Sequence, residues 1–173
     1  SLDFLVDLNV KKIKIPSGEI SNLPFIWKIA KKDKPIIMST GMSDLSEIEN
    51  AVATIFHSQN NDKEPSSMDE ILEICKKEIS YTLNSNLSLL HCTSQYPAPL
   101  DELNLNCIEM LSEKFGLNVG YSDHSDGIEV SLAAVAKGAK IIEKHFTLDK
   151  NLQGPDHKAS LEPKELKNMI DGI

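Results

Sequence analysis

Segments typical of buried strands alternate along this chain with segments typical of amphipathic helices. Five short apolar runs have the length and composition of strands: residues 10–15, 34–40, 87–93, 117–123 and 139–146. Helix periodicity or helix-start residues mark 22–30, 43–56, 67–74, 100–115, 128–137 and a last segment that begins at Pro163. Residues 57–67 and 149–161 are polar and predict loops. This repeated βα order predicts an α/β fold with a parallel sheet covered on both faces.

The polar residues at the ends of the predicted strands favour a closed barrel over an open doubly wound sheet. No GxGxxG turn follows the first strand, which weakens a dinucleotide-binding open sheet. A barrel gathers all its strand ends on one rim, whereas an open sheet gathers them only at its switch point. Five strands in 173 residues are fewer than the eight strands and roughly 250 residues of a whole barrel. We therefore expect part of a (β/α)8 TIM barrel, belonging to a longer protein.

The composition excludes several other classes of protein. A net charge of −8 argues against a general nucleic-acid surface. No apolar run reaches the length of about 18 residues that a membrane span needs, and no signal-like leader opens the chain. Cys75, Cys92 and Cys107 are too few and too widely spaced for a disulfide framework. We expect reduced thiols and a cytoplasmic protein.

Two histidines follow neighbouring predicted strands. Ser122 and His124 have the same parity in one strand, and Glu143 and His145 share parity in the next. If these strand ends meet, the two imidazoles could bind one Mn²⁺, Fe²⁺, Co²⁺ or Zn²⁺ ion. Asp123 and Glu143 would then be able to orient the rings. The alternative is that each histidine is an ordinary polar residue of the rim.

Two turns that contain a glycine and hydroxyl side chains suggest an anion site. Lys14 is followed by Ser17, Gly18 and Glu19, and the run STGMS at 39–43 begins with Ser39 just before a helix. Lysine, hydroxyls and open backbone N–H groups can hold a phosphate or carboxylate. The pair of turns indicates a phosphorylated acid as ligand, although each glycine could equally serve only its turn.

A third stretch, HCTSQYPAP at 91–99, offers groups that suit a polyol. Ser94 supplies a hydroxyl, and Tyr96 supplies a planar ring with a hydroxyl of its own. Asp156, in the later loop LQGPDHK, could bind sugar hydroxyls as well. Each stretch could equally be a solvated loop.

These motifs together resemble a known family. The chain contains KIPSGE, PIIMSTGM, LLHCTSQYPAP, GYSDHS, IIEKHFTLDK and GPDH, in this order. Their order and spacing resemble the sialic acid synthase family, which includes the N-acetylneuraminate, legionaminate and pseudaminate synthases. The resemblance covers nearly the whole chain; residues 57–86 are atypical and suggest an enlarged connection.

The resemblance implies a fold, a reaction and partners. Family members have an N-terminal (β/α)8 barrel followed by a small antifreeze-like domain that reaches the partner's site in a homodimer. They condense phosphoenolpyruvate with an N-acetylated amino sugar, such as N-acetylmannosamine, to a nine-carbon 2-keto acid, release phosphate and use Mn²⁺ or Mg²⁺. By this resemblance residues 1–173 hold about strands 4 to 8, without the first strands and the antifreeze-like domain. We would then expect little or no activity from the chain alone.

The resemblance also assigns roles to individual residues. Catalytic roles fall to Glu19 and Lys14, phosphoenolpyruvate contacts to Lys14, Ser17, Ser39 and Ser122, sugar contacts to Ser94, Tyr96 and Asp156, and metal ligation to His124 and His145. Ser94 stands where asparagine is common. Pro16 replaces a more usual glycine, which removes one backbone N–H from the anion site.

Two other functions fit the same residues. A barrel aldolase or isomerase acting on a sugar phosphate would use Lys14 as a Schiff base. A synthase-like protein of polysaccharide assembly would bind these ligands without turnover.

Overall fold

The computed structural model describes residues 2–77 and 86–173, apart from the side chains of 74–77. The helices are α1 (Leu2–Asp7), α2 (Leu23–Ala30), α3 (Leu45–Asn60), α4 (Met68–Lys77), α5 (Asn106–Phe115), α6 (Glu129–Ala136) and α7 (Pro163–Gly172). The strands are β1 (Ile13–Ile15), β2 (Ile36–Ser39), β3 (Leu87–Cys92), β4 (Asn118–Asp123) and β5 (Ile142–Lys144), and short 3₁₀ turns occupy Ser17–Glu19, Leu100–Glu102 and His157–Ala159. The chain forms two compact units, Ser1–Ser88 and Leu89–Ile173.

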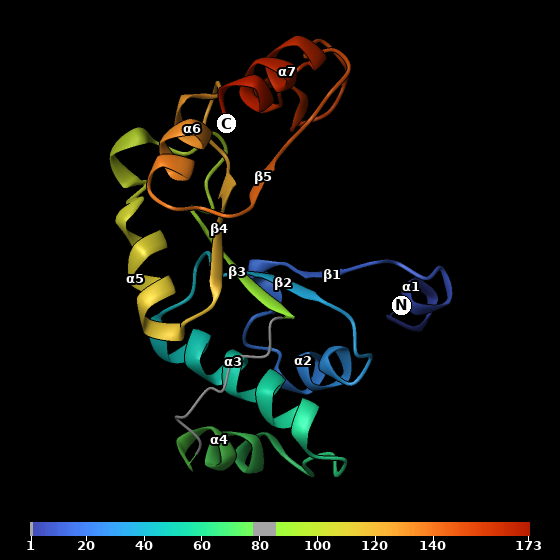
Figure 1. Cartoon of the computed structure of the whole chain (residues 1–173). Coiled ribbons are helices and arrows are strands. Elements are labelled where there is room, and N and C mark those ends of the chain that lie inside the picture. The colour runs from blue at the N-terminus through green and yellow to red at the C-terminus, as the bar shows by residue number, and fades with distance from the viewer. Residues whose placement is uncertain (1, 78–85) are drawn as a thin grey trace. The chain divides into compact units, whose positions relative to one another are not determined.

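In the first unit, β1 and β2 pair in parallel so that their apolar residues share one face. Ile13 is opposite Ile36, and Ile15 is opposite Met38, and all four side chains are buried. Lys14 alternates to the other face and is exposed. Helices α2 and α3 pack against each other in this unit (Figure 1).

The starts of α2 and α3 follow from local sequence. Asn22 is the N-cap of α2, and a proline occupies its first turn, as expected. Asp44 caps α3 in a capping box with Glu47, where each side chain accepts the other residue's backbone N–H. The helix runs to Asn60, so the predicted loop begins too early. Ser58 explains the extension, because its hydroxyl is buried and donates to the Trp27 carbonyl at 3.0 Å.

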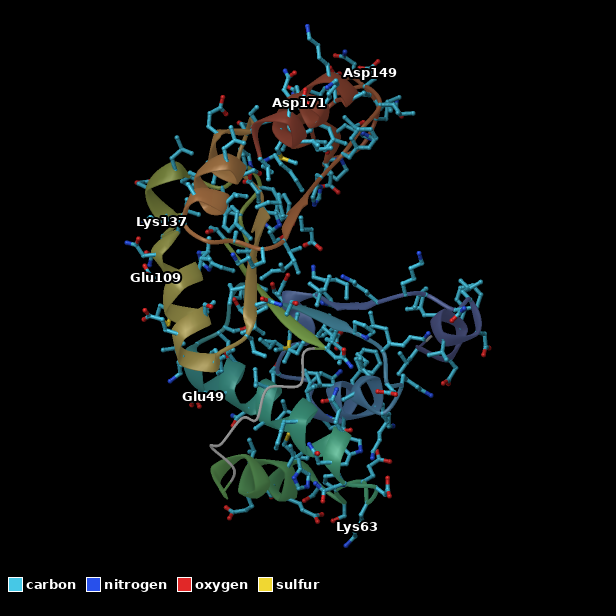
Figure 2. All side chains as sticks on the ribbon, in the orientation of Figure 1. Glu49, Lys63, Glu109, Lys137, Asp149 and Asp171 are labelled. Atoms are coloured by element: carbon cyan, nitrogen blue, oxygen red, sulfur yellow. The ribbon has the colours of Figure 1, made fainter. Side chains whose placement is uncertain are left out.

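In the second unit, α5 and α6 pack against β4, and α7 packs against α6. Ile108, Leu111 and Phe115 form the buried side of α5, while Glu109 points outward (Figure 2). The helix begins at Asn106 rather than at residue 100 as predicted. Asn104 adopts a positive φ of 42°, which interrupts the helix.

The last strand is shorter than the predicted run 139–146. Only Ile142–Lys144 pair with β4 in parallel, opposite Tyr121–Asp123. After His145 the chain changes partner, because Phe146 forms a bridge with Leu161. The Leu161 N–H donates to the His145 carbonyl at 2.9 Å, so the chain beyond this point no longer follows β4.

The strands are ordered β1-β2-β3-β4-β5 in the sheet. A doubly wound sheet reverses its strand order at a switch point, whereas a barrel keeps chain order. The observed α/β fold is therefore consistent with a partial TIM barrel, and its assignment to strands 4 to 8 stays a prediction. No helix within residues 2–77 or 86–173 is long and apolar enough to cross a membrane. Cys92 and Cys107 are free thiols, and the Cys75 side chain lies outside the described residues.

Gly120 gives a direct test of the β4 packing. A Cβ at this position would lie 2.4 Å from the Ile141 carbonyl oxygen and 2.7 Å from Leu90 Cδ2. That carbonyl accepts the Tyr121 N–H at 2.8 Å and so cannot move freely. We expect Gly120→Ala to lower the free energy of unfolding by about 1–3 kcal/mol, measured by urea denaturation.

Gly18→Ala is the matched control for this substitution. A Cβ at Gly18 would meet no atom within 4 Å, so its free energy of unfolding should change little. Equal stabilities of the two variants would contradict the packing described for Gly120.

Candidate functional site

Four polar side chains share one face of β4, β5 and the residues that follow them. Ser122 is the register partner of Glu143, and its hydroxyl donates to Glu143 Oε1 at 2.7 Å. His124 and His145 come two residues later on their respective strands, and their ring centroids are 6.0 Å apart with planes at 77°. The alternation predicted from the sequence therefore brings these residues together.

The tautomer of His124 follows from its hydrogen bonds. Nδ1 lies 2.6 Å from the Thr93 carbonyl oxygen, which can only accept, so Nδ1 carries the proton. Nε2 is then the lone-pair atom, and it accepts from the Tyr96 hydroxyl at 2.7 Å. Ser122 Oγ lies 3.2 Å from the same nitrogen. The lone pair of His124 thus lies on the side of Ser122, where it accepts the Tyr96 hydroxyl; a metal ion bound there would replace that hydrogen bond.

The surroundings also keep His124 neutral. Its pKa is lowered from the ordinary value, chiefly because burial disfavours the charged ring, and the positive charge of His145 acts in the same direction. The hydrogen bond to Thr93 and the carboxylates of Asp123 and Glu143 oppose this shift but do not cancel it. A neutral imidazole is the form that binds a metal ion.

Tyr96 covers His124 and remains 49% exposed. The two rings stack with centroids 3.9 Å apart, and the Tyr96 ring lies 5.1 Å from that of His145. Burial raises the pKa of Tyr96, and electrostatic interactions with Cys92, Asp156 and Glu143 raise it further. Tyr96 is therefore a neutral hydrogen-bond donor with Asp156 in its vicinity. Ser94 and Asp156 are exposed on their loops.

The two histidines fit a divalent ion that takes its other ligands from elsewhere. Among the residues that the structure describes, no group of three His, Cys, Asp or Glu side chains could hold a metal by itself. The Thr93 carbonyl holds the proton of His124 on Nδ1 and so leaves the lone pair on Nε2. Two imidazoles suit Mn²⁺ or a similar ion that completes its shell with oxygen ligands.

The first unit contains a second group of candidate residues at the ends of β1 and β2. The Ser17 hydroxyl accepts the Gly41 N–H at 3.1 Å, which joins the two glycine-containing turns. Ser39 is only 3% exposed, and its hydroxyl has no hydrogen-bond partner. Lys14 is exposed, and Glu19 accepts a hydrogen bond from the Asn22 side chain at 2.8 Å. A buried hydroxyl without a partner indicates a group that a ligand would satisfy.

The opposite face of β4 and β5 carries a buried ion pair that sequence reasoning did not find. Lys144 Nζ lies 3.0 Å from Asp123 Oδ2, with side-chain exposures of 2% and 0%. Asp123 also accepts bonds from Ser125 and Ser131, so its hydrogen bonds go to these serines and Lys144 and not directly to an imidazole, as we had expected. The sequence did contain a signal for this ion pair. Asp123 and Lys144 each precede a histidine by one residue, so their side chains point to the other face of the strand.

The whole chain, residues 1–173, matches the NeuB family, and the protein belongs to this family. The chain is 53% identical over 173 residues to the N,N'-diacetyllegionaminic acid synthase of Campylobacter jejuni, covering 100% of this chain and 45% of that protein. It is 37% identical over 174 residues to human N-acetylneuraminate-9-phosphate synthase, covering 100% of this chain and 42% of that protein.

The fold has a counterpart among solved structures. The crystal structure of the spore coat polysaccharide biosynthesis protein SpsE from Bacillus subtilis matches with a TM-score of 0.82 and 37% identity, covering 99% of this chain and 42% of that chain. The chain thus spans less than half the length of these relatives. The resemblance to sialic acid synthases predicted from the sequence is confirmed.

The lowered pKa of His124 predicts how stability depends on pH. The folded state favours the neutral ring, so this contribution is complete above about pH 6.5. It is lost as the pH falls through the folded-state pKa of His124. In urea denaturation from about pH 8 to about pH 5, His124→Gln should lose less stability than the wild-type protein. Parallel stability curves would show that His124 is not shifted as described.

Proposed function

We propose that the protein of which this chain forms part condenses phosphoenolpyruvate with an N-acetylated amino sugar. The product would be a nine-carbon 2-keto sugar acid, and phosphate would be released. Membership of the NeuB family supports this reaction class, as do relatives named as synthases of legionaminic and neuraminic acids. The observation that carries the proposal is the His124–His145 pair beside the hydrogen-bonded Ser122 and Glu143.

The first unit supplies groups that suit phosphoenolpyruvate. Lys14 would pair with one of its anionic groups, and Ser17 and Ser39 would donate hydroxyl hydrogen bonds. Ser39 is the most informative of these, because its buried hydroxyl lacks a partner in the protein. An oxyanion would satisfy it, and such a charged acceptor gives a stronger hydrogen bond than a neutral one.

The second unit supplies groups that suit the sugar and a divalent cation. His124 and His145 would hold Mn²⁺ or Mg²⁺, whose chemistry when bound is to polarise the sugar's aldehyde oxygen as a Lewis acid. Tyr96, Ser94 and Asp156 would bind sugar hydroxyls. The Tyr96 hydroxyl donates its hydrogen to His124 Nε2, so its oxygen would accept a hydrogen bond from a sugar hydroxyl.

The proposed reaction balances as follows. The enol carbon of phosphoenolpyruvate forms a bond to the aldehyde carbon, and the aldehyde oxygen takes up a proton. Glu19 removes a proton from the water that adds to C2 of phosphoenolpyruvate. The C2–O bond to the phosphate group of the tetrahedral species then breaks, the C2 hydroxyl gives its proton to the departing phosphate, and a ketone is left. Positioning of the two substrates by Lys14 and the hydroxyls would supply much of the acceleration.

Replacing His145 tests the metal role. His145→Ala in the full-length protein should abolish metal-dependent phosphate release from phosphoenolpyruvate, because one of the two protein ligands is lost. His57→Ala is the control, since His57 packs near Trp27 in the first unit with ring centroids 5.6 Å apart. Full activity after metal removal would refute the assignment.

Replacing Ser39 tests the phosphoenolpyruvate role. Ser39→Ala removes a buried hydroxyl without a partner, so the free energy of unfolding should stay the same or rise slightly. The dissociation constant for phosphoenolpyruvate should rise by about 10-fold or more, since a charge-assisted hydrogen bond is lost. Calorimetric titration and urea denaturation of the full-length protein measure the two quantities.

Ser58→Ala provides the matched control for Ser39. Ser58 is equally buried, but its hydroxyl donates to the Trp27 carbonyl. Its loss should lower the free energy of unfolding by about 1 kcal/mol and leave phosphoenolpyruvate binding intact. The reverse pattern would show that Ser39 serves the fold and not the ligand.

The similarity to SpsE keeps a second function in view, because that protein is named for spore coat polysaccharide biosynthesis. A synthase-like assembly protein would bind the ligands without releasing phosphate. Borohydride trapping of a Lys14 adduct would instead identify an aldolase. We propose a homodimeric cytoplasmic enzyme, and the free thiols of Cys92 and Cys107 fit a reducing compartment.

A further inference from the structure

We infer that Asp123 and Lys144 are positioning residues that set the geometry of His124 and His145. They lie on the opposite face of β4 and β5 and would not touch a ligand of the histidine face. The inference rests on the proposed role of the two histidines as metal ligands, and it deepens that role.

The register between β4 and β5 places the ion pair and the two histidines on opposite faces. Ser122 is opposite Glu143, and Asp123 is opposite Lys144. Because side chains alternate, a slip of one residue would turn a strand's polar set to the other face. Asp123 and Lys144 can pair on the buried side of the strands that faces α6 only in the observed register. The same register brings the ring centroids of His124 and His145 to 6.0 Å.

The hydrogen bonds of Asp123 and Lys144 hold the backbone on both sides of His124. Asp123 Oδ1 accepts the Ser125 backbone N–H at 2.9 Å and the Ser125 hydroxyl at 2.6 Å. Asp123 Oδ2 accepts the Ser131 hydroxyl of α6 at 2.6 Å. Lys144 Nζ donates to the Ser125 carbonyl at 2.7 Å. His124 therefore lies between two residues that the network fixes.

His145 directly follows Lys144 and is held on both sides. Its carbonyl accepts the Leu161 N–H at 2.9 Å, so His145 is held from one side by this bond and from the other by the ion pair. The coupling between the ion pair and the rings runs through one peptide unit on each strand, from Asp123 to His124 and from Lys144 to His145.

Stability alone does not account for a buried ion pair such as Asp123–Lys144. Burying two charges costs desolvation that their attraction often only offsets, so apolar replacements are frequently neutral. The best-attested use of a buried polar pair is to specify a register. Here Asp123 accepts bonds from Ser125 and Ser131 in addition to the ion pair, and Lys144 donates to the Ser125 carbonyl, so the pair belongs to a connected network.

The test replaces both charges at once in the full-length protein. Asp123→Asn with Lys144→Met keeps side-chain length while it removes the ion pair. We expect Mn²⁺ affinity, measured by electron paramagnetic resonance of free Mn²⁺, to fall about 10- to 100-fold, the range seen when groups that orient metal ligands are changed. Lys167→Met with Asp171→Asn makes the same chemical change at an exposed pair and should leave affinity unchanged.

A second readout needs no metal. In the wild-type protein, ¹⁵N chemical shifts should show His124 protonated on Nδ1, and the double variant should show a mixture of tautomers. A folded double variant with wild-type Mn²⁺ affinity and an unchanged tautomer would overturn the inference. If the double variant does not fold, Ser131→Ala should give a smaller shift toward the mixture, and no shift would count against the proposal.

The two proposals fail in different ways. If the wild-type protein binds no Mn²⁺, the metal role of the histidines is wrong. The tautomer comparison then still decides whether Asp123 and Lys144 position the rings.

Discussion

The register between β4 and β5 is the constraint on which the candidate site depends. Parallel pairing of Ser122 with Glu143 and of Asp123 with Lys144 divides two short segments into two faces. One face carries the hydroxyl, the carboxylate and, just beyond the strands, two imidazoles. The other carries charges that are satisfied among themselves and by the serines of the helix side. Successive side chains of a strand point to opposite faces. The same two strands therefore present the candidate site on one face and hold the buried ion pair on the other.

His124 and Ser39 differ in how completely their polar atoms are satisfied. In the second unit His124 has both ring nitrogens engaged, one with the Thr93 carbonyl and one with the Tyr96 hydroxyl. In the first unit the buried Ser39 hydroxyl has no partner, although the neighbouring Ser17 hydroxyl accepts the Gly41 N–H. A cation bound by His124 would have to displace the Tyr96 hydroxyl from Nε2. An anion at Ser39 would instead add a bond that the protein itself does not supply.

Most of the fold was predictable because its signals are local. Apolar runs mark the strands, and Asn22, Asp44 and Gly116 mark helix ends by their caps. The errors occur where tertiary contacts or backbone geometry decide. Ser58 extends α3 through a bond to Trp27, and the positive φ of Asn104 delays α5. In the site, parity was enough to group Ser122 with His124 and Glu143 with His145. The partners of Asp123 could not be known, because a strand's sequence states which face a residue takes but not which helix covers that face.

The placement of the buried ion pair has a consequence for how this family could diversify. Relatives are named as synthases of different products, N,N'-diacetyllegionaminic acid and N-acetylneuraminate 9-phosphate. Ser94 and Asp156 lie on exposed loops and take no part in the Asp123–Lys144 network. Under the proposed function, substitutions of the Ser94 and Asp156 side chains would change contacts to the substrate and leave the Asp123–Lys144 pair in place. Substrate contacts and the charges that hold the two strand ends would then be free to vary independently.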